Sequence, residues 1–174
     1  NPWASTFLDT FRYLDQLGRL AKAGVQMVAH NTLAASDYGL LDETTLRPRP
    51  NYWAAVLWRR LIGTIVLDAG VHHGMHLYAH CRQGVRGAVT LLVINTDRTA
   101  AATLRLPVSS ERYALAADDL QSTEVKLNGT VLELGRNDEL PQFAAVTSPP
   151  GSVEIAPATI TFLTVADAEN PACQ

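Results

Sequence analysis

Two stretches of the chain repeat apolar residues at three- and four-residue spacing, which is the pattern of an amphipathic helix. The first covers residues 5–23 and is followed by Gly24, a residue suited to ending a helix. Gly18 lies inside this pattern and indicates close packing or a weak point. The second covers residues 51–62. We therefore expect two helices in the first third of the chain.

A short run between these helices, Val25 to Ala29, is mostly apolar and predicts a buried strand of the parallel type. It turns polar at His30 and Asn31 and enters a long loop, residues 32–49. Helix, strand, loop and helix form the end of an alternating α/β pattern, and barrel folds place their sites at such strand ends. One strand and two helices cannot close a barrel. Either the other units are absent from this chain or the α/β interpretation is wrong.

Short β-prone runs separated by turn residues follow Gly63 and continue to the end of the chain. Many short strands at this spacing predict an antiparallel sandwich or barrel. The clearest hairpin has Asn128-Gly129 at its turn, a pair suited to type I′ geometry. The expected strands are 64–67, 75–81, 88–95, 103–106, 112–116, 124–127, 130–134, 153–155 and 160–165.

Composition excludes several classes of protein. The chain has 174 residues, of which 47% are hydrophobic and 18% charged, as in ordinary globular domains. The formal net charge of -3 gives no reason to expect nucleic acid as a partner. The apolar runs are far too short to cross a membrane.

Four histidines between residues 72 and 80 invite a metal site, but their spacing argues against one. His76 and His80 alternate with apolar residues in a strand period, which separates them by roughly 13 Å, too far for one zinc ion. His72 and His73 precede Gly74, which argues against a helix. We therefore favour a polar strand face, with no metal and no other cofactor.

Other polar groups have simple structural interpretations. Asn128-Gly129-Thr130 matches a glycosylation sequon, but the hairpin explains it without a sugar. Asp118 and Asp119 are adjacent, so their side chains point apart and do not make a carboxylate pair.

Arg47 and Arg49 lie in the loop beyond the predicted strand end. They could meet an anionic substrate, but a solvated loop is the simpler interpretation.

The remaining candidates are His30, Asn31, Asp37 and Tyr38, at the predicted strand end and in the loop after it. No Ser-His-Asp arrangement, phosphate-binding loop or Cys-x-x-Cys motif accompanies them. From the residues alone, this segment contacts a ligand without supplying the catalysts. Cys81 and Cys173 are either two unrelated thiols or one disulfide that ties down the C-terminal tail.

The order of YLDQLGRLAKAG, VQMVAHNTL, DYGLLD and RPRPNYWAAVLWRRLIG resembles the last α/β units of the heparanase-like glycoside hydrolases, glycoside hydrolase family 79. LYAHC, VKLNGTVLEL and a cysteine near the C-terminus continue the resemblance into the β region. The resemblance implies the last units of a (β/α)8 barrel in residues 1–66, followed by an antiparallel β-sandwich in residues 67–174.

The same resemblance implies a retaining glycosidase that acts on β-linked glucuronic acid, in oligosaccharides or in polysaccharides such as heparan sulfate. Two glutamates about 5–5.5 Å apart would cleave the bond. Both are expected upstream of Asn1, in the N-terminal part of the same enzyme, so this chain would contain no catalytic residue. Glu43 does not replace them because it lies out in the loop.

Carried over by position, Tyr38 matches a tyrosine that helps to hold the glucuronate carboxylate. Asp37 stands where other members can have asparagine, and His30 takes a strand-end position that can hold glutamine. Cys81 and Cys173 match the family's disulfide, which implies an oxidising compartment and a secreted or periplasmic protein. The alternatives are a noncatalytic carbohydrate-binding β-sandwich and another barrel glycosidase with an appended sandwich.

Overall fold

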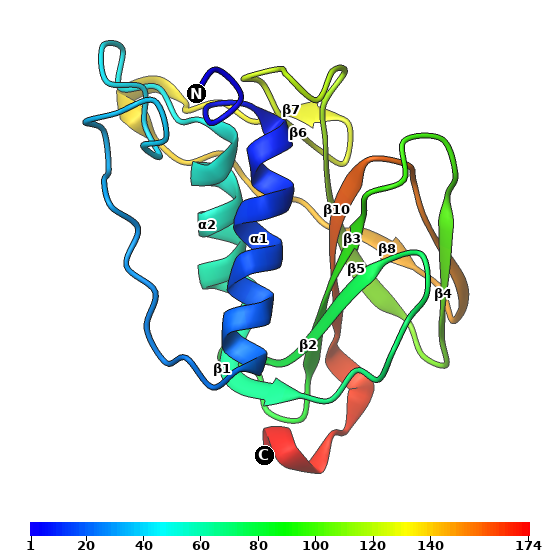
Figure 1. The fold of residues 1–174 in the computed structure, drawn as a ribbon. Helices are drawn as coiled ribbons and strands as arrows, with labels where there is room; N and C mark the ends of the chain where they lie inside the picture. Colours follow the sequence, from blue (N-terminus) through cyan, green and yellow to red (C-terminus); the bar gives the residue numbers. More distant parts are fainter.

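Two helices lie side by side against one face of a large antiparallel sheet (Figure 1). The computed structural model describes residues 1–174. Helix α1 spans Phe7–Lys22 and helix α2 spans Pro50–Leu61, which confirms both predicted helices. Gly24 has a φ of 83° and lets the chain leave α1 in the left-handed conformation expected at a helix end.

The large sheet has eight strands, and every strand pair in it is antiparallel. Their hydrogen-bonded order is β1, β2, β3, β10, β5, β6 and β7, and β8 also pairs with β5. A second sheet holds β4 (Ala102–Leu106) and β9 (Gly151–Ile155). The bounds in the large sheet are β1 Ile62–Leu67, β2 His76–Arg82, β3 Val89–Asn95, β5 Ser110–Ala116, β6 Lys126–Leu127, β7 Thr130–Val131, β8 Val146–Ser148 and β10 Thr159–Val165.

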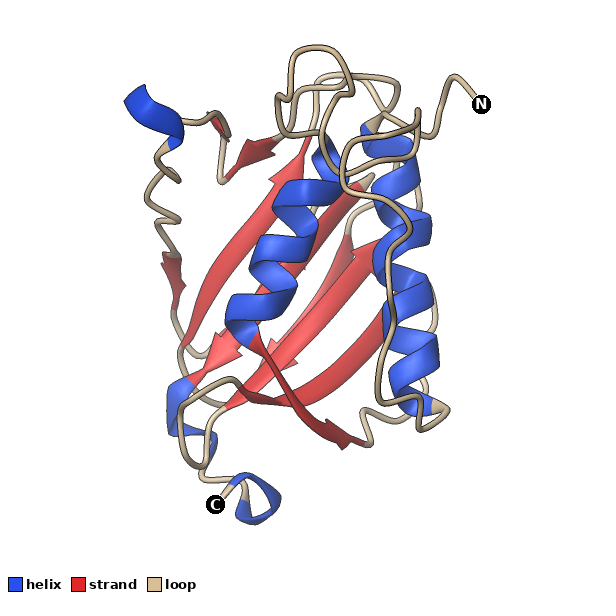
Figure 2. Ribbon diagram, turned by 90° about the vertical axis from the view of Figure 1, so that its left-hand side faces the viewer, coloured by secondary structure: helices blue, strands red, loops and turns tan.

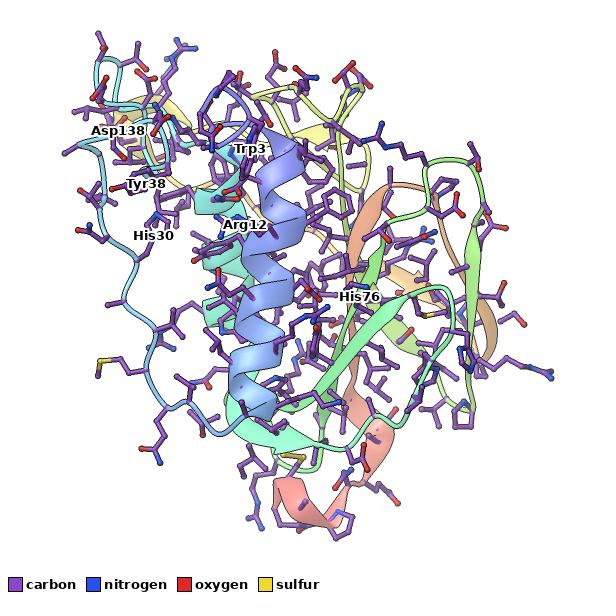
Figure 3. All side chains as sticks on the ribbon, in the orientation of Figure 1. Trp3, Arg12, His30, Tyr38, His76 and Asp138 are labelled. Carbon is purple, nitrogen blue, oxygen red and sulfur yellow. A yellow bond between two sulfur atoms is a disulfide. The ribbon has the colours of Figure 1, made fainter.

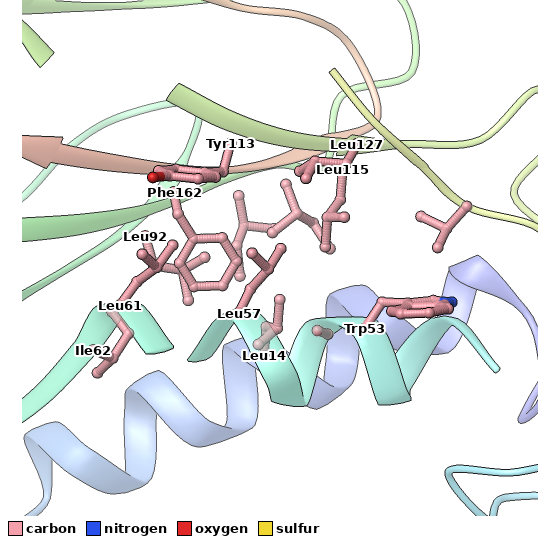
Figure 4. Packing of buried hydrophobic residues seen from close by; sticks show 14 of the residues in the cluster. Leu14, Trp53, Leu57, Leu61, Ile62, Leu92, Tyr113, Leu115, Leu127 and Phe162 are labelled. Carbon is pink, nitrogen blue, oxygen red and sulfur yellow. The ribbon is translucent and has the colours of Figure 1, made fainter. Parts of the chain in front are cut away.

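Apolar side chains fill the space on both faces of the large sheet. The larger cluster joins the helices to the sheet and includes Leu14, Trp53 and Phe162 (Figure 4). A smaller cluster, which includes Leu104 and Leu163, joins the large sheet to the β4–β9 pair. Side chains alternate along a strand, so the consecutive residues Phe162 and Leu163 of β10 enter opposite cores. The result is a helix layer, a large sheet and a small second sheet.

The strand predicted at Val25 to Ala29 does not form, so this prediction is wrong for the chain as it folds here. The segment is extended and runs outside the helix layer without a strand partner (Figures 1 and 2). Met27 is 84% exposed and Val28 is 47% exposed. A strand exists only when a neighbour accepts and donates its backbone hydrogen bonds, and no strand of this chain lies beside the segment.

The β region is antiparallel as predicted, with differences in its less regular parts. The strands predicted at 124–127 and 130–134 shorten to β6 and β7, and β8 was not predicted. The hairpin between β6 and β7 is confirmed: Asn128 and Gly129 both have positive φ, at 49° and 87°, as a type I′ turn requires. The second sheet has only two strands, so it covers part of the large sheet.

One disulfide joins Cys81 of β2 to Cys173, which confirms the predicted pairing. The backbone of the C-terminal segment also bonds to the turn before β3, because Gly87 N donates to Cys173 O at 2.7 Å. The tail is therefore held on the end of the sheet.

Candidate functional site

The loop after the extended segment brings His30 and Tyr38 together (Figure 3). His30 Nε2 lies 3.0 Å from the backbone oxygen of Tyr38, so this ring nitrogen donates to the carbonyl. The two rings have centroids 6.5 Å apart, and the ring of Tyr13 on α1 lies 5.7 Å from His30 on the other side. His30 is thus packed between a helix and the loop.

The side chain of Tyr38 is 41% exposed, and its hydroxyl has no hydrogen-bond partner in the chain. This hydroxyl is therefore free to bind a ligand. Asp37 is exposed in the loop, next to Tyr38 in sequence. Asn31 is exposed and its side chain forms no hydrogen bond. Of the four predicted residues, the structure directly joins only His30 and Tyr38.

Arg49 is 9% exposed, which contradicts its interpretation as a solvated loop residue. Its guanidinium donates to the carbonyls of Ser36 and Gly39, at 2.7 and 3.3 Å, and to Asp42 at 3.2 Å. Asp42 also accepts bonds from Thr45, and these bonds lower its pKa to about 2. The loop that carries Tyr38 is therefore held from inside by an arginine.

An open cleft of about 1070 Å³ lies beside this loop. Its walls come from the loop 41–49, the first turn of α2 and the segment 131–135. Asp42 and Arg49 belong to both the loop and the cleft, whereas none of the four predicted site residues lines it. Sequence reasoning missed the cleft because its walls are about 90 residues apart and no motif links them.

The histidine-bearing face of β2 packs against the helices, which bury Tyr78 and His80 and leave the His76 side chain 40% exposed. Asp15 of α1 bonds to His76 and to Tyr78, each at 2.6 Å. Burial alone would raise the pKa of Asp15, but hydrogen bonds from Tyr78, His76 and Arg19 lower it.

Burial and the bond to Asp15 raise the pKa of Tyr78 to about 12. His80, which points to the same face, is buried, and burial lowers its pKa. The strand period predicted from the spacing is confirmed, because His76, Tyr78 and His80 share one face of β2. No group of three or more histidine, cysteine or carboxylate side chains is arranged around a metal position.

The other polar candidates have separate structural partners. Asp118 binds Lys126 at 2.6 Å, while Asp119 caps the backbone of Gln121 at 2.6 Å, so the two carboxylates do not act as a pair. Glu43 is exposed in the loop. Neither helix combines the length and apolarity needed to cross a bilayer.

Comparison with known proteins gives relatives over nearly the whole chain, although no family model matches it. Baicalin-β-D-glucuronidase of Scutellaria baicalensis is 34% identical over 170 residues, which cover 92% of this chain and 32% of that protein. Heparanase of Gallus gallus is 31% identical in an alignment of 189 positions that covers 98% of this chain and 36% of that protein. Inactive heparanase-2 of Homo sapiens is 29% identical in an alignment of 201 positions that covers 100% of this chain and 34% of that protein.

Solved structures show the same fold at low sequence identity. An arabinofuranosidase superposes with a TM-score of 0.61 at 13% identity, over 91% of this chain and 37% of that protein. The family 51 arabinofuranosidase of Xanthomonas axonopodis pv. citri gives a TM-score of 0.56 at 15% identity, over 86% of this chain and 33% of that protein. By fold, the chain is therefore similar to a part of glycoside hydrolases.

The relatives found by sequence show which group of glycoside hydrolases the chain resembles. The resemblance to the heparanase-like glycoside hydrolases is confirmed, because a β-glucuronidase and a heparanase align with 92% and 98% of the chain at 34% and 31% identity. The chain spans roughly a third of the length of the curated relatives it matches.

Proposed function

We propose that the chain is part of a retaining glycoside hydrolase that cleaves β-linked glucuronic acid. In this proposal the chain contributes substrate contacts, and two glutamates elsewhere in a longer protein break the bond. The observation that carries the proposal is the similarity to proteins named baicalin-β-D-glucuronidase and heparanase over 92% and 98% of the chain.

Tyr38 is the main substrate contact in this proposal. Its free hydroxyl would donate a hydrogen bond to the glucuronate carboxylate, and bonds to charged acceptors are about twice as strong as neutral ones. Asp37 and Asn31 are exposed and adjoin Tyr38 and His30 in sequence, and they would meet sugar hydroxyls. His30 would shape this wall of the site through its bond to the Tyr38 backbone.

The chain by itself would not perform the chemistry. A retaining mechanism needs two carboxyl groups about 5–5.5 Å apart, one to protonate the leaving oxygen and one to attack the anomeric carbon. We assign neither role to a residue of this chain. In the longer protein, residues 1–66 would complete a barrel, with Val25 to Ala29 paired to neighbouring strands, and residues 67–174 would form the appended sandwich. The disulfide supports a secreted or periplasmic location.

The test uses the longer protein that contains this chain, with aryl β-glucuronide and aryl β-glucoside as substrates. Tyr38→Phe should lower kcat/KM for the glucuronide by about 10- to 100-fold, mainly through KM, because one hydrogen bond to a charged group is worth roughly 1.5–3 kcal/mol. Tyr52→Phe, at the edge of the neighbouring cleft, serves as the matched control and should leave KM unchanged. If Tyr38→Phe left the kinetics unchanged, the carboxylate-binding role that the family resemblance implies for Tyr38 would be wrong.

The second candidate is a protein that binds carbohydrate without cleaving it. The similarity to inactive heparanase-2 is the observation that favours it. Glucuronide binding measured by calorimetry, without hydrolysis of any aryl glycoside, would support this candidate against the first.

A further inference from the structure

We propose that Arg49 is a positioning residue that fixes the loop 36–42 and thereby presents the Tyr38 hydroxyl to the ligand. This inference rests on the proposed function for its consequence in substrate binding. Its structural part stands on the contacts of the arginine alone.

The contacts of Arg49 bracket Tyr38 on both sides. The guanidinium Nη1 donates to Ser36 O, before the tyrosine, and to Gly39 O, after it. The backbone N–H of Arg49 donates to Leu40 O at 2.9 Å. Three carbonyls of a five-residue stretch are thus bound by one residue that lies ten positions or more from Ser36 and Gly39 in sequence.

His30 supplies a further restraint on the same stretch, because its Nε2 donates to Tyr38 O at 3.0 Å. The carbonyls of Ser36, Tyr38 and Gly39 are therefore all occupied from the protein side. With its backbone held in this way, Tyr38 has little freedom apart from its side-chain torsions, and 41% of its surface stays exposed. A pre-ordered contact residue costs less entropy on binding than one in a mobile loop.

The chemistry of this position suits arginine and not lysine. A planar guanidinium reaches several acceptors in fixed directions, whereas an ammonium group is a point charge on a flexible stem. The charge of Arg49 is balanced by Asp42 at 3.2 Å. Since Arg49 is 9% exposed and both its Nη1 and Nη2 groups donate to the loop, it is placed to order the loop rather than to bind a substrate anion itself.

Arg47 provides a matched control two residues earlier. It lies in the same loop and on the wall of the cleft, but it is exposed and its guanidinium forms no ion pair. Arg49→Lys and Arg47→Lys therefore make the same chemical change at a buried bracing position and at an exposed one.

Hydrogen exchange of the longer protein measures the structural part. In Arg49→Lys we expect the amides of residues 36–42 to exchange about tenfold faster, because loss of about 1.4 kcal/mol of local stability corresponds to a factor of ten. Arg47→Lys should exchange as the wild-type protein does. Unchanged exchange in Arg49→Lys would overturn the inference whether or not the protein acts on glucuronides.

A double-mutant cycle with Tyr38→Phe measures the functional part, using KM for aryl β-glucuronide. Arg49→Lys alone should raise KM several-fold with little change in kcat, and it should have almost no further effect once the Tyr38 hydroxyl is absent. If the two substitutions raised KM by independent factors that multiply in the double mutant, the inference would be overturned, because Arg49 would then not act through Tyr38. If Tyr38→Phe alone changes nothing, the proposed role of Tyr38 fails, and faster exchange in Arg49→Lys still supports the bracing role.

Discussion

Asn128 is the residue whose replacement should reveal most about the β region. Its side-chain oxygen accepts from Ala114 N at 2.9 Å, and its Nδ2 donates to Arg112 O and Ala144 O at 3.0 and 2.9 Å. One amide therefore ties the β6–β7 turn to β5 and to the segment before β8. Asn128→Asp keeps the shape and the accepting oxygen but places a carboxylate oxygen against two carbonyls.

The expected cost follows from these contacts. Two hydrogen bonds disappear at about 1 kcal/mol each, and the two carbonyls then face a negative charge, so we expect a loss of about 2–4 kcal/mol. With a urea m-value of about 2 kcal/mol/M, the unfolding midpoint should fall by about 1–2 M. The carbonyls favour the protonated acid and so raise its folded pKa. The variant therefore regains stability as pH falls from its raised folded pKa to the ordinary aspartate value of about 3.9, and loses this stability as pH rises again.

Urea unfolding at pH 7 and at about pH 4 tests this prediction against a matched control, Thr130→Ala. That control destroys the Asn-Gly-Thr sequon but leaves every bond of Asn128 in place, and as an exposed substitution it should change stability by less than about 0.5 kcal/mol. Equal destabilisation by both variants would point to an attached sugar instead of the hydrogen bonds. A fully stable Asn128→Asp protein would show that these bonds do not hold the hairpin.

Two further predictions concern the helix–sheet interface. A Cβ added at Gly18 would lie 2.5 Å from the ring of Tyr78, so Gly18→Ala should destabilise by about 1–3 kcal/mol in thermal unfolding, whereas a gain in stability would show that helix propensity decides instead. His80 is buried and its pKa is lowered, so its contribution is complete above the ordinary pKa of 6.5 and is lost as pH falls below that value. Stability measured between pH 7 and 5 should fall by at most about 1.4 kcal/mol per pH unit from this group, and His80→Asn should flatten the slope.

The sequence predicted those parts of the fold whose stability is local or whose burial pattern is regular. Both helices followed from their apolar stripes, and the face shared by His76, Tyr78 and His80 followed from the two-residue period of a strand. The turn at Asn128 followed from the conformational preference of an Asn-Gly pair. In each case, neighbours in sequence determine the structure.

What the sequence did not predict depends on residues far apart. Arginine side chains are usually exposed, and Arg49 lies in a polar loop, so its sequence context does not indicate burial. Only the folded chain places its guanidinium against the carbonyls of Ser36 and Gly39. The cleft beside it needs the loop 41–49 and the segment 131–135 together. The disulfide was predicted because the resemblance supplied the pairing, since two cysteines alone do not specify their partner.

The segment from Val25 to Ala29 shows the difference between a local sequence pattern and the distant partners that a strand needs. Its composition suits a strand buried on both faces, yet here Met27 is 84% exposed and the backbone has no strand beside it. An unpaired apolar strand is normally avoided because it invites aggregation. The segment is apolar, yet no other part of this chain covers it. This supports the proposal that strands of a longer protein pair with it. The position of His30 and Tyr38 at the end of this segment would then depend on those strands as well as on Arg49.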